Sequence, residues 1–193
     1  MKPNQLTIIA LLFVAAPSAA SWSLDNDASQ VSFVSVKAGD AGEVHRFTQI
    51  SGNLAADGTA TVTIELASVD TMIPLRDERM REMLFQTTLF PTATLTTSID
   101  MGLLGKIEPG ESTNMIADLA LQLHDQEIVL TAEMIVARLG DQRLMVSSRK
   151  PIIVNAASVD LVNGIEALRE IANLPSISKA VPVSFVLSFE QSE

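Results

Sequence analysis

The sequence predicts an all-β protein with about eight antiparallel strands and two short helices. Two observations carry this prediction. Apolar residues recur at every second position in several segments, which is the period of a half-buried strand. Clusters of Gly, Asp and Pro separate these segments, and such residues suit the tight turns that join antiparallel neighbours. Eight such strands can pack as a sandwich or close into a barrel, and periodicity alone leaves both open.

Four segments alternate most clearly. In residues 59–66, Val62 and Ile64 alternate with Thr61 and Thr63, so one face is apolar and the other is rich in threonine. The same pattern recurs in residues 92–99, 114–123 and 183–189. Four further segments alternate less clearly, because both of their faces carry apolar residues: 29–36, 43–50, 127–138 and 143–154. Turn residues lie at 38–42, 56–58, 108–110 and 139–141.

Two segments have the helical period instead. Residues 74–84 begin with a proline, which suits a first helical turn, and carry an apolar stripe beside charged residues. Asp77 lies in the first turn, where a carboxylate stabilises the helix by interacting with the positive end of its dipole. Arg81 follows one turn later and is its expected partner in an ion pair. The second helix is predicted to begin at Asn163 as its N-cap, to have Glu166 as the second residue of a capping box, and to end before Pro175.

Length and composition restrict the possible functions. A chain of 193 residues with no internal repeat and no long linker is expected to be one domain. Lys and Arg number 13 against 23 Asp and Glu, and this balance argues against a nucleic-acid partner. The absence of Cys excludes disulfides and thiol chemistry, and two His with no Tyr leave few acid–base groups. We therefore expect no enzymatic activity, no catalytic residue and no cofactor.

One pair of residues could belong to a metal site. Glu43 and His45 lie two apart on one expected strand, so their side chains face the same way. A metal would need a third ligand, and the only other histidine, His124, lies far away in the sequence in a turn-like segment. The prediction is therefore that the protein has no metal site.

Residues 1–20 are predicted to be a secretory signal peptide. Lys2 gives a positive start, residues 6–16 are apolar except for one threonine, and small residues precede Ser21. The alternative is a membrane anchor, but the apolar run is much shorter than the about 20 residues that span a bilayer. The mature chain is expected to be residues 21–193, a single domain exported to a bacterial periplasm and not an integral membrane protein.

Several short motifs carry a resemblance to a known family. They are Trp22-Ser23-Leu24-Asp25, Ser29-Gln30-Val31-Ser32-Phe33, Ser68-Val69-Asp70-Thr71, Arg76-Asp77, Met80, Leu84-Phe85, Phe90-Pro91 and Ala93-Thr94-Leu95. Together they resemble the YceI-like family of secreted lipid-binding proteins. The resemblance implies an eight-stranded, lipocalin-like antiparallel β-barrel and so favours the barrel over the sandwich. It also implies an apolar small-molecule partner in the interior, such as a polyisoprenoid, a quinone or a fatty-acid-like lipid.

Two features depart from the pattern of that family. The family usually has glycines near its fifth strand and in the turn after it, where this chain has Ala117 and His124-Asp125. Residues 161–181 look like an insertion before the last strand. Either feature could reshape the mouth of the barrel.

The inward positions of the expected strands give the candidate ligand-binding residues. Few of them are bulky and aromatic residues are only 4% of the chain, so the interior could hold a channel. The alternative is a packed core. The candidates are Phe33, Phe47, Val62, Ile64, Leu66, Leu95, Thr97, Leu119, Leu121, Phe185 and Leu187, with Val31 and Ala93 beside them.

Arg76 is the one charged candidate. A guanidinium in the first helical turn opposes the helix dipole, so another partner is expected. That partner is a strand-end carbonyl, a carboxylate such as Asp70, or an anionic head group such as a phosphate. The structural partner is favoured, in which case Arg76 and Asp77 pin the first helix across one end of the barrel.

The functional hypothesis is periplasmic binding of an isoprenoid-type or other long-chain lipid in the barrel interior, for transport or storage and without a chemical step. The alternative is an envelope-interaction or stress-related protein whose barrel is filled and whose helices or loops dock a protein partner. The sequence leaves the oligomeric state open.

Overall fold

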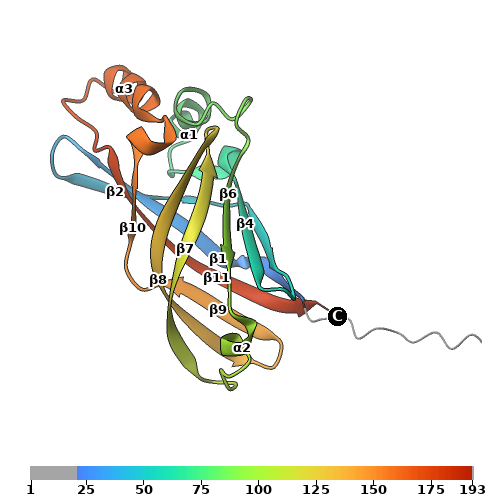
Figure 1. Ribbon diagram of the computed structural model, residues 1–193. Helices are drawn as coiled ribbons and strands as arrows, with labels where there is room; N and C mark the ends of the chain where they lie inside the picture. Colours follow the sequence, from blue (N-terminus) through green and yellow to red (C-terminus); the bar gives the residue numbers. More distant parts are fainter. Residues whose placement is uncertain (1–20, 193) are drawn as a thin grey trace, which may run out of the picture.

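A computed structural model describes residues 21–192, in which eleven strands form one antiparallel sheet (Figure 1). Eight strands close into a barrel because the last strand pairs with the first. In order around the barrel they are β1 (Ser21–Lys37), β3 (Ile50–Leu54), β4 (Thr59–Glu65), β6 (Thr92–Ser98), β7 (Ser112–Leu123), β8 (Gln126–Gly140), β9 (Arg143–Ser148) and β11 (Ala180–Ser192). This closure confirms the predicted eight-stranded barrel.

The wall of the barrel follows the predicted alternation. β4 lies between β3 and β6, and its Val62 and Ile64 are paired with Leu95 and Ala93 of β6. The same alternation continues in β7, which pairs with β8 over its whole length. Because successive side chains of a strand point to opposite faces, one apolar set from each strand is directed into the barrel.

Two segments that were predicted as single strands are each divided in two. Residues 43–50 divide into β2 (Ala41–Phe47) and β3, and the chain between them is held by Ser68, which accepts from the Thr48 amide and from the Gln49 amide. Residues 143–154 divide into β9 and β10 (Ile152–Asn155) just after Pro151, which has no amide hydrogen to donate to a sheet. The prediction of two continuous strands was therefore wrong.

The divisions have the same effect on the two strands that close the barrel. β1 pairs with β2 along residues 31–37 and with β3 at residues 22–23. β11 pairs with β10 along residues 180–183 and with β9 along residues 186–190. A short strand, β5 (Val69–Asp70), extends the sheet beyond β2. Each closing strand is thus shared between one barrel neighbour and one additional strand.

Helical segments lie at both ends of the barrel. At one end are α1 (Pro74–Arg79), the π-helical turn η2 (Met80–Leu84) that continues it, and α3 (Val162–Ile171). Figure 1 shows α1 and α3 side by side there and α2 (Met101–Leu104) at the opposite end. Two short 3-10 turns are η1 (Leu66–Ser68) and η3 (Ala156–Val159). Both predicted helices are present, and α2 is an addition that Asp100 caps by accepting from two amides.

The start of α3 differs from the prediction. Leu161 occupies the N-cap position in place of Asn163, and no side chain caps the helix there. Leu161 is buried and its carbonyl accepts from the Ile165 amide, so apolar packing positions the first turn. Glu166 forms ion pairs with Arg169 and Lys179 instead of closing a capping box.

α3 crosses η2 at close range. A Cβ atom at Gly164 would lie 2.7 Å from both the Leu84 Cα and the Met83 carbonyl oxygen. Glycine is therefore required for the two backbones to approach this closely. The contact holds α3 over the same end of the barrel as α1, and we call this end the helix end.

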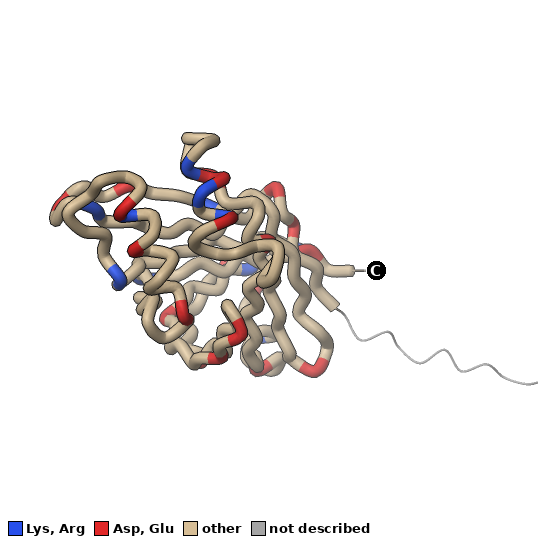
Figure 2. The backbone as a smooth tube through the Cα atoms, turned by 90° about the horizontal axis from the view of Figure 1, so that it is seen from above, with Lys and Arg blue, Asp and Glu red and all other residues tan. Residues whose placement is uncertain are grey.

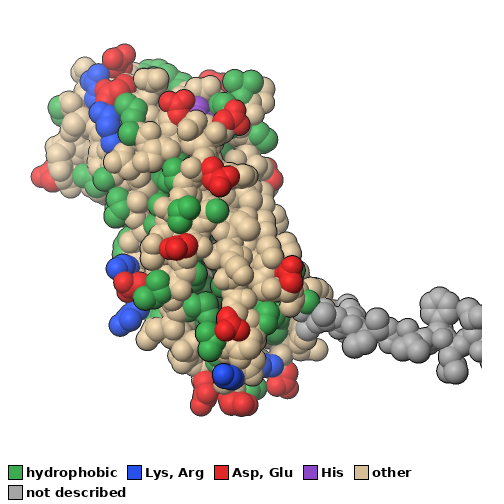
Figure 3. Space-filling model, in the orientation of Figure 1, with side chains coloured by type: hydrophobic (Ala, Val, Ile, Leu, Met, Phe, Trp, Pro, Cys, Tyr) green, Lys and Arg blue, Asp and Glu red, His purple; other side chains and the backbone are tan. Residues whose placement is uncertain are grey.

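Acidic side chains outnumber basic ones in this chain, with 23 Asp and Glu against 13 Lys and Arg. Figure 2 shows Asp and Glu positions spread along the backbone, and Figure 3 shows acidic side chains scattered among apolar ones on one face. Within residues 21–192, no helix combines the length and the apolar character that a membrane span requires. The predicted signal peptide, residues 1–20, lies outside the described residues.

Candidate functional site

A cavity of about 460 Å³ lies inside the barrel. Inward-facing side chains of the strands form its wall, and Val159 of η3 with Ile165 and Leu168 of α3 cover it at the helix end. The volume is in the range of small-molecule binding sites. The barrel interior is therefore more than a packed core.

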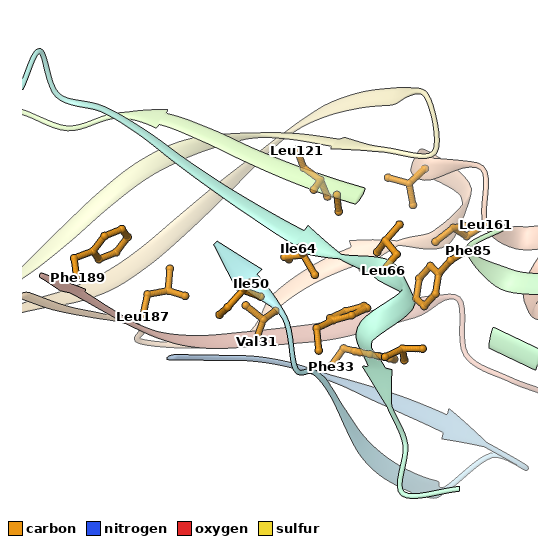
Figure 4. Packing of buried hydrophobic residues seen from close by; sticks show 14 of the residues in the cluster. Val31, Phe33, Ile50, Ile64, Leu66, Phe85, Leu121, Leu161, Leu187 and Phe189 are labelled. Carbon is orange, nitrogen blue, oxygen red and sulfur yellow. The ribbon is translucent and has the colours of Figure 1, made fainter. Parts of the chain in front are cut away.

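The structure brings all of the predicted site residues together around this cavity. Each of the strands β4, β6, β7 and β11 directs every second side chain inward, as the alternation predicts. The residues that line the cavity include Phe33, Phe47, Val62, Ile64, Leu66, Arg76, Leu95, Thr97, Leu119, Leu121, Phe185 and Leu187, together with Val31 and Ala93. Figure 4 shows several of these side chains converging between the strands.

Sequence reasoning missed the part of the wall that β8, β9 and β10 form. Its lining residues are Leu130, Met134, Val136, Leu144, Val146, Ile152 and Val154. Both faces of these segments carry apolar residues, so the pattern of every second residue could not show which face points inward. On β8, for example, Val129 is 67% exposed whereas its neighbour Leu130 lines the cavity. Val136 and Val146 are paired across β8 and β9 and so share one face of the sheet. Both line the cavity, so this face is the inward one.

The two ends of the cavity differ in composition. At the helix end the rings of Phe33 and Phe47 lie 5.4 Å apart, and those of Phe47 and Phe85 lie 5.7 Å apart. Toward the opposite end the lining includes Leu187 and Phe189 of β11, which Figure 4 shows at a distance from Phe33 and Phe85. The rings of Phe33, Phe47 and Phe85 therefore form one aromatic group where the cavity meets the helices.

Polar groups line the cavity at the helix end. We use the name polar cluster for Ser35, Lys37, Glu43, His45 and Arg76, all of which line the cavity. Glu43 Oε2 accepts from Lys37 Nζ at 2.9 Å and from Arg76 Nη1 at 2.5 Å. The hydrogen bond from Lys37 and the positive charge of Arg76 hold the pKa of Glu43 below its ordinary value, against the opposing effect of burial. Glu43 is therefore ionised at neutral pH.

The partners of Arg76 are structural, as favoured from the sequence. Its Nη2 donates to the Thr71 carbonyl oxygen at 2.6 Å, at the end of β5, and its Nη1 binds Glu43. The expected carboxylate partner, Asp70, pairs with Arg46 instead, at 2.9 Å. Arg76 thus has a strand-end carbonyl and a carboxylate as partners, but the carboxylate is that of Glu43, because the register of β2 and β5 places Asp70 directly opposite Arg46.

Asp77 holds the loop before α1 and does not form the expected pair with Arg81. One carboxylate oxygen accepts from the Thr71 amide at 2.8 Å and from the Thr71 hydroxyl at 2.5 Å. Thr71 thus receives contacts from two successive helix residues, Arg76 and Asp77. Together these contacts fix α1 to β5 across one end of the barrel.

His45 is the most deeply buried member of the polar cluster, with 3% of its surface exposed. Its Nε2 lies 2.8 Å from Ser35 Oγ, and its ring lies 5.2 Å from that of Phe33. Burial lowers the pKa of His45, and the positive charge of Arg76 lowers it further, so the imidazole is neutral at pH 7. Its Nδ1 has no hydrogen-bond partner among the described residues.

The Ser35–His45 contact does not have the form of a hydrolytic triad. A triad needs a carboxylate on the second ring nitrogen to orient the imidazole, and His45 Nδ1 is unpartnered within residues 21–192. Ser35 also lies within β1 and not on a sharp strand-to-helix turn. In the same residues, no group of three or more His, Cys, Asp or Glu side chains is placed to hold a metal.

Thr97 places a hydroxyl in the wall without exposing it as a free polar group. Its Oγ1 donates to the Asp118 carbonyl oxygen of β7 at 2.8 Å. The backbone pairing of β6 with β7 covers only residues 94–96 of β6, so this bond extends the contact between the two strands. The Thr97 hydroxyl is therefore satisfied within the wall of the barrel.

The comparisons with known proteins agree with this architecture. A sequence model of the YceI-like domain matches residues 22–189. The chain belongs to the YceI-like family. A solved structure that is 38% identical, a polyisoprenoid binding domain from Saccharophagus degradans implicated in plant cell wall breakdown, superposes with a TM-score of 0.87. The match covers 89% of this chain and 98% of that one.

Two more distant structures are similar in fold. BcnA from Burkholderia cenocepacia is 21% identical, with a TM-score of 0.63 and coverage of 86% of this chain and 98% of that chain. The YceI protein of Campylobacter jejuni is 18% identical, with a TM-score of 0.54 and coverage of 77% and 85%. At these identities the likeness concerns the fold alone. No curated protein matched the sequence.

Of the departures from the YceI-like pattern, Ala117 lies within β7, opposite Ala132 of β8, whereas the His124-Asp125 turn and the 161–181 segment lie at the helix end. The β7–β8 turn is formed by His124 and Asp125, which adopt the left-handed φ values of 55° and 58° that glycine would adopt more easily. The His124 ring packs against Phe90, with centroids 4.0 Å apart. The 161–181 segment forms α3 and supplies cavity-lining residues, among them Leu161 and Ile177. The turn and the segment thus lie beside the part of the cavity that is covered by helices.

Proposed function

We propose that this protein binds an isoprenoid-type or other long-chain lipid in the cavity of its barrel, and carries or stores that lipid in the periplasm without a chemical step. The observation that carries the proposal is the cavity, whose wall consists mostly of Leu, Ile, Val, Met and Phe side chains. A hydrocarbon chain suits such a wall, because a polar ligand would lose its hydrogen bonds to water there.

Apolar burial alone supplies sufficient affinity for such a ligand. Each methylene group removed from water contributes about 0.8 kcal/mol, so about a dozen of them contribute on the order of 10 kcal/mol. Association costs about 4–15 kcal/mol in lost freedom of motion. About 5 to 19 buried methylene groups therefore offset this cost, and each further one adds to the affinity.

The relative from Saccharophagus degradans supports the ligand class, because that domain binds polyisoprenoid and is 38% identical to this chain.

The composition of residues 1–20 supports the periplasmic location. N-terminal sequencing of protein from the cell envelope tests the location, and we expect the mature chain to begin at or next to Ser21. Recovery of the intact Met1 form in membranes alone would contradict it.

Native mass spectrometry of protein purified from its own cell envelope tests the binding. We expect a bound species of defined mass that organic solvent removes from the folded protein. Chromatography of the extract then identifies the lipid and its chain length.

Two tryptophan variants make this test specific to the cavity. Ile64→Trp adds bulk to the cavity wall, and we expect it to exclude the lipid while circular dichroism still reports a folded barrel. Val129→Trp adds the same ring on the outer face of β8, where Val129 is 67% exposed, and should retain the lipid. A lipid-free parent protein together with an unfolded Ile64→Trp variant would support the filled barrel that docks a protein partner.

A further inference from the structure

The charged residues of the cavity have the opposite sign to the protein as a whole. The chain has a net charge of −10. Among the described residues that line the cavity, however, three are cations and one is a carboxylate: Lys37, Arg76, Arg79 and Glu43. A cavity for a wholly apolar ligand would need no charged group, since burying a charge costs free energy unless it is paired.

The cations of the polar cluster have more hydrogen-bonding capacity than their protein partners use. Lys37 and Arg76 share a single carboxylate oxygen, Glu43 Oε2. An ammonium group has three donors and a guanidinium has five, so both side chains retain donors after binding Glu43 and Thr71. Arg76 Nε has no hydrogen-bond partner among the described residues, and the same holds for His45 Nδ1.

The polar cluster also reaches from the protein surface to the cavity. The side chains of Lys37 and Glu43 are 30% and 35% exposed, whereas His45 is buried behind them. The strand end that carries Lys37 is fixed to the 176–178 segment, because the Ala38 amide donates to Ser176 O and the Ser178 amide donates to Val36 O. Ile177 between these two bonds lines the cavity. A ligand in the cavity can therefore present one end to water at this place.

We propose that the polar cluster is a head-group site for an anionic oxygen group, a carboxylate or a phosphate, on the lipid whose chain occupies the cavity. The proposal rests on the proposed function, since it assigns the position of one end of that lipid. Lys37 and Arg76 supply charge-assisted hydrogen bonds to the head group. His45 and the Phe33 ring form the boundary between the head group and the apolar chain.

The neutral state of His45 is consistent with this assignment. Burial is the main reason that the pKa of His45 is lowered, the charges of Arg76 and Lys37 lower it further, and the carboxylates of Glu43 and Asp77 raise it. The neutral imidazole therefore adds no third positive charge to those of Lys37 and Arg76. A head group with one negative charge would balance the second of these two cations, since Lys37 and Arg76 share the single carboxylate of Glu43. A neutral alcohol of the same chain length would accept a hydrogen bond but would balance no charge, and the two can be compared directly.

Isothermal titration calorimetry with three probes of equal chain length tests the proposal. The probes are hexadecanoic acid, hexadecyl phosphate and hexadecanol, each titrated at neutral pH into the full-length protein after its native lipid has been extracted. We expect the acid or the phosphate to bind about tenfold more tightly than the alcohol, the factor typical of a hydrogen bond to a charged group. The stronger of the two ionised probes identifies the head-group class.

Charge variants distinguish a head-group site from a merely structural cluster. Lys37→Gln should weaken binding of the ionised probes about tenfold and leave hexadecanol unchanged. Glu43→Gln should strengthen binding of the ionised probes, because it removes the competing carboxylate. Arg143→Gln is the matched control, since Arg143 pairs with Glu190 and does not line the cavity. Thermal melting of each variant verifies that it is folded.

Three results are possible. Selective changes for the ionised probes, in opposite directions for Lys37→Gln and Glu43→Gln, support the head-group site. Equal binding of all three probes by the parent and both variants would overturn the head-group site and leave lipid binding intact. Failure of the folded parent protein to bind any probe would contradict the proposed function itself.

Discussion

In the wall of the barrel, the register of adjacent strands brings Val62 and Ile64 to Leu95 and Ala93, and every second residue of these strands follows the same rule. At the helix end, a single ion pair joins Arg76 to Glu43. The wall side chains are interchangeable in kind, since any apolar residue at an inward position lines the cavity. The helix end instead depends on particular groups, among them the Gly164 backbone against η2 and the Asp77 carboxylate on Thr71.

This difference assigns two properties of lipid binding to two regions: the wall sets how much apolar surface a ligand can bury, and the helix end sets which ligand is preferred. The wall supplies a cavity whose affinity grows with apolar area, and truncation of one residue that faces the cavity changes that area only slightly. The helix end supplies the charged groups and the tightly packed contacts, where one substitution removes an interaction that no neighbour replaces. The following variants measure how far the two regions differ in stability.

The largest expected effect belongs to Leu66, at the junction of the two regions. Leu66 is 1% exposed, and Leu66→Ala should lower the free energy of unfolding by about 2–5 kcal/mol, because the site is enclosed by packed neighbours. Leu95→Ala makes the same truncation on a half-buried wall residue, where less buried apolar surface is lost, and should cost less. Urea denaturation measures both variants. Equal losses would mean that wall and helix end are equally well packed.

The next effect concerns the contact between α3 and η2. Gly164→Ala places a Cβ atom 2.7 Å from backbone atoms of η2, so the helices must separate, at a cost of about 1–3 kcal/mol. Gly140→Ala is the control, because nothing lies within 4 Å of a Cβ atom there, and it should change stability by less than about 0.5 kcal/mol. Thermal unfolding compares the two. An unchanged melting temperature for Gly164→Ala would show that α3 can move without loss.

A smaller effect is expected at the loop before α1. Asp77→Asn weakens the bonds to the Thr71 amide and hydroxyl, and should lower stability by about 1 kcal/mol while the chain-length preference for lipid stays unchanged. Glu78→Gln, at an exposed position of the same helix, should have no effect. A changed chain-length preference in Asp77→Asn would mean that this loop contacts the lipid chain.

The smallest effect is a dependence of stability on pH that comes from His45. Burial lowers the pKa of His45 below its ordinary value of 6.5, so the unfolded state takes up a proton more readily than the folded state. The stabilisation is complete above that value and is lost as the pH falls toward the folded-state pKa. Glu43, whose pKa lies below 4.5, contributes to the same loss only in more acidic solution.

His45→Gln should therefore reduce the slope of stability against pH between neutral pH and about pH 5. Urea denaturation at a series of pH values measures this slope for the parent and the variant. Identical slopes would mean that the buried imidazole does not titrate with unfolding, and the assignment of His45 as a neutral group would be wrong.

The wall was predictable because its information is local. Alternation in residues 59–66 and 92–99 determines which side chains share a face, and the predicted cavity residues of the strands lie on the inward face. The prediction failed where this local information is ambiguous. Val129 and Leu130 are both apolar, so the sequence could not show which of them points inward, and only the pairing across the sheet decides it.

By itself, then, the sequence determined the strands and the apolar character of one face of each, since both depend on residue type at a fixed spacing. Its motifs resemble the YceI-like family, and that resemblance implied the barrel. The tertiary structure decided the helix end. The partner of Arg76, the break at residues 48–49 and the close crossing at Gly164 all depend on which distant segments come together when the barrel closes. Such contacts leave no periodic signal, because a single ion pair or glycine contact joins residues that have no fixed separation in the sequence.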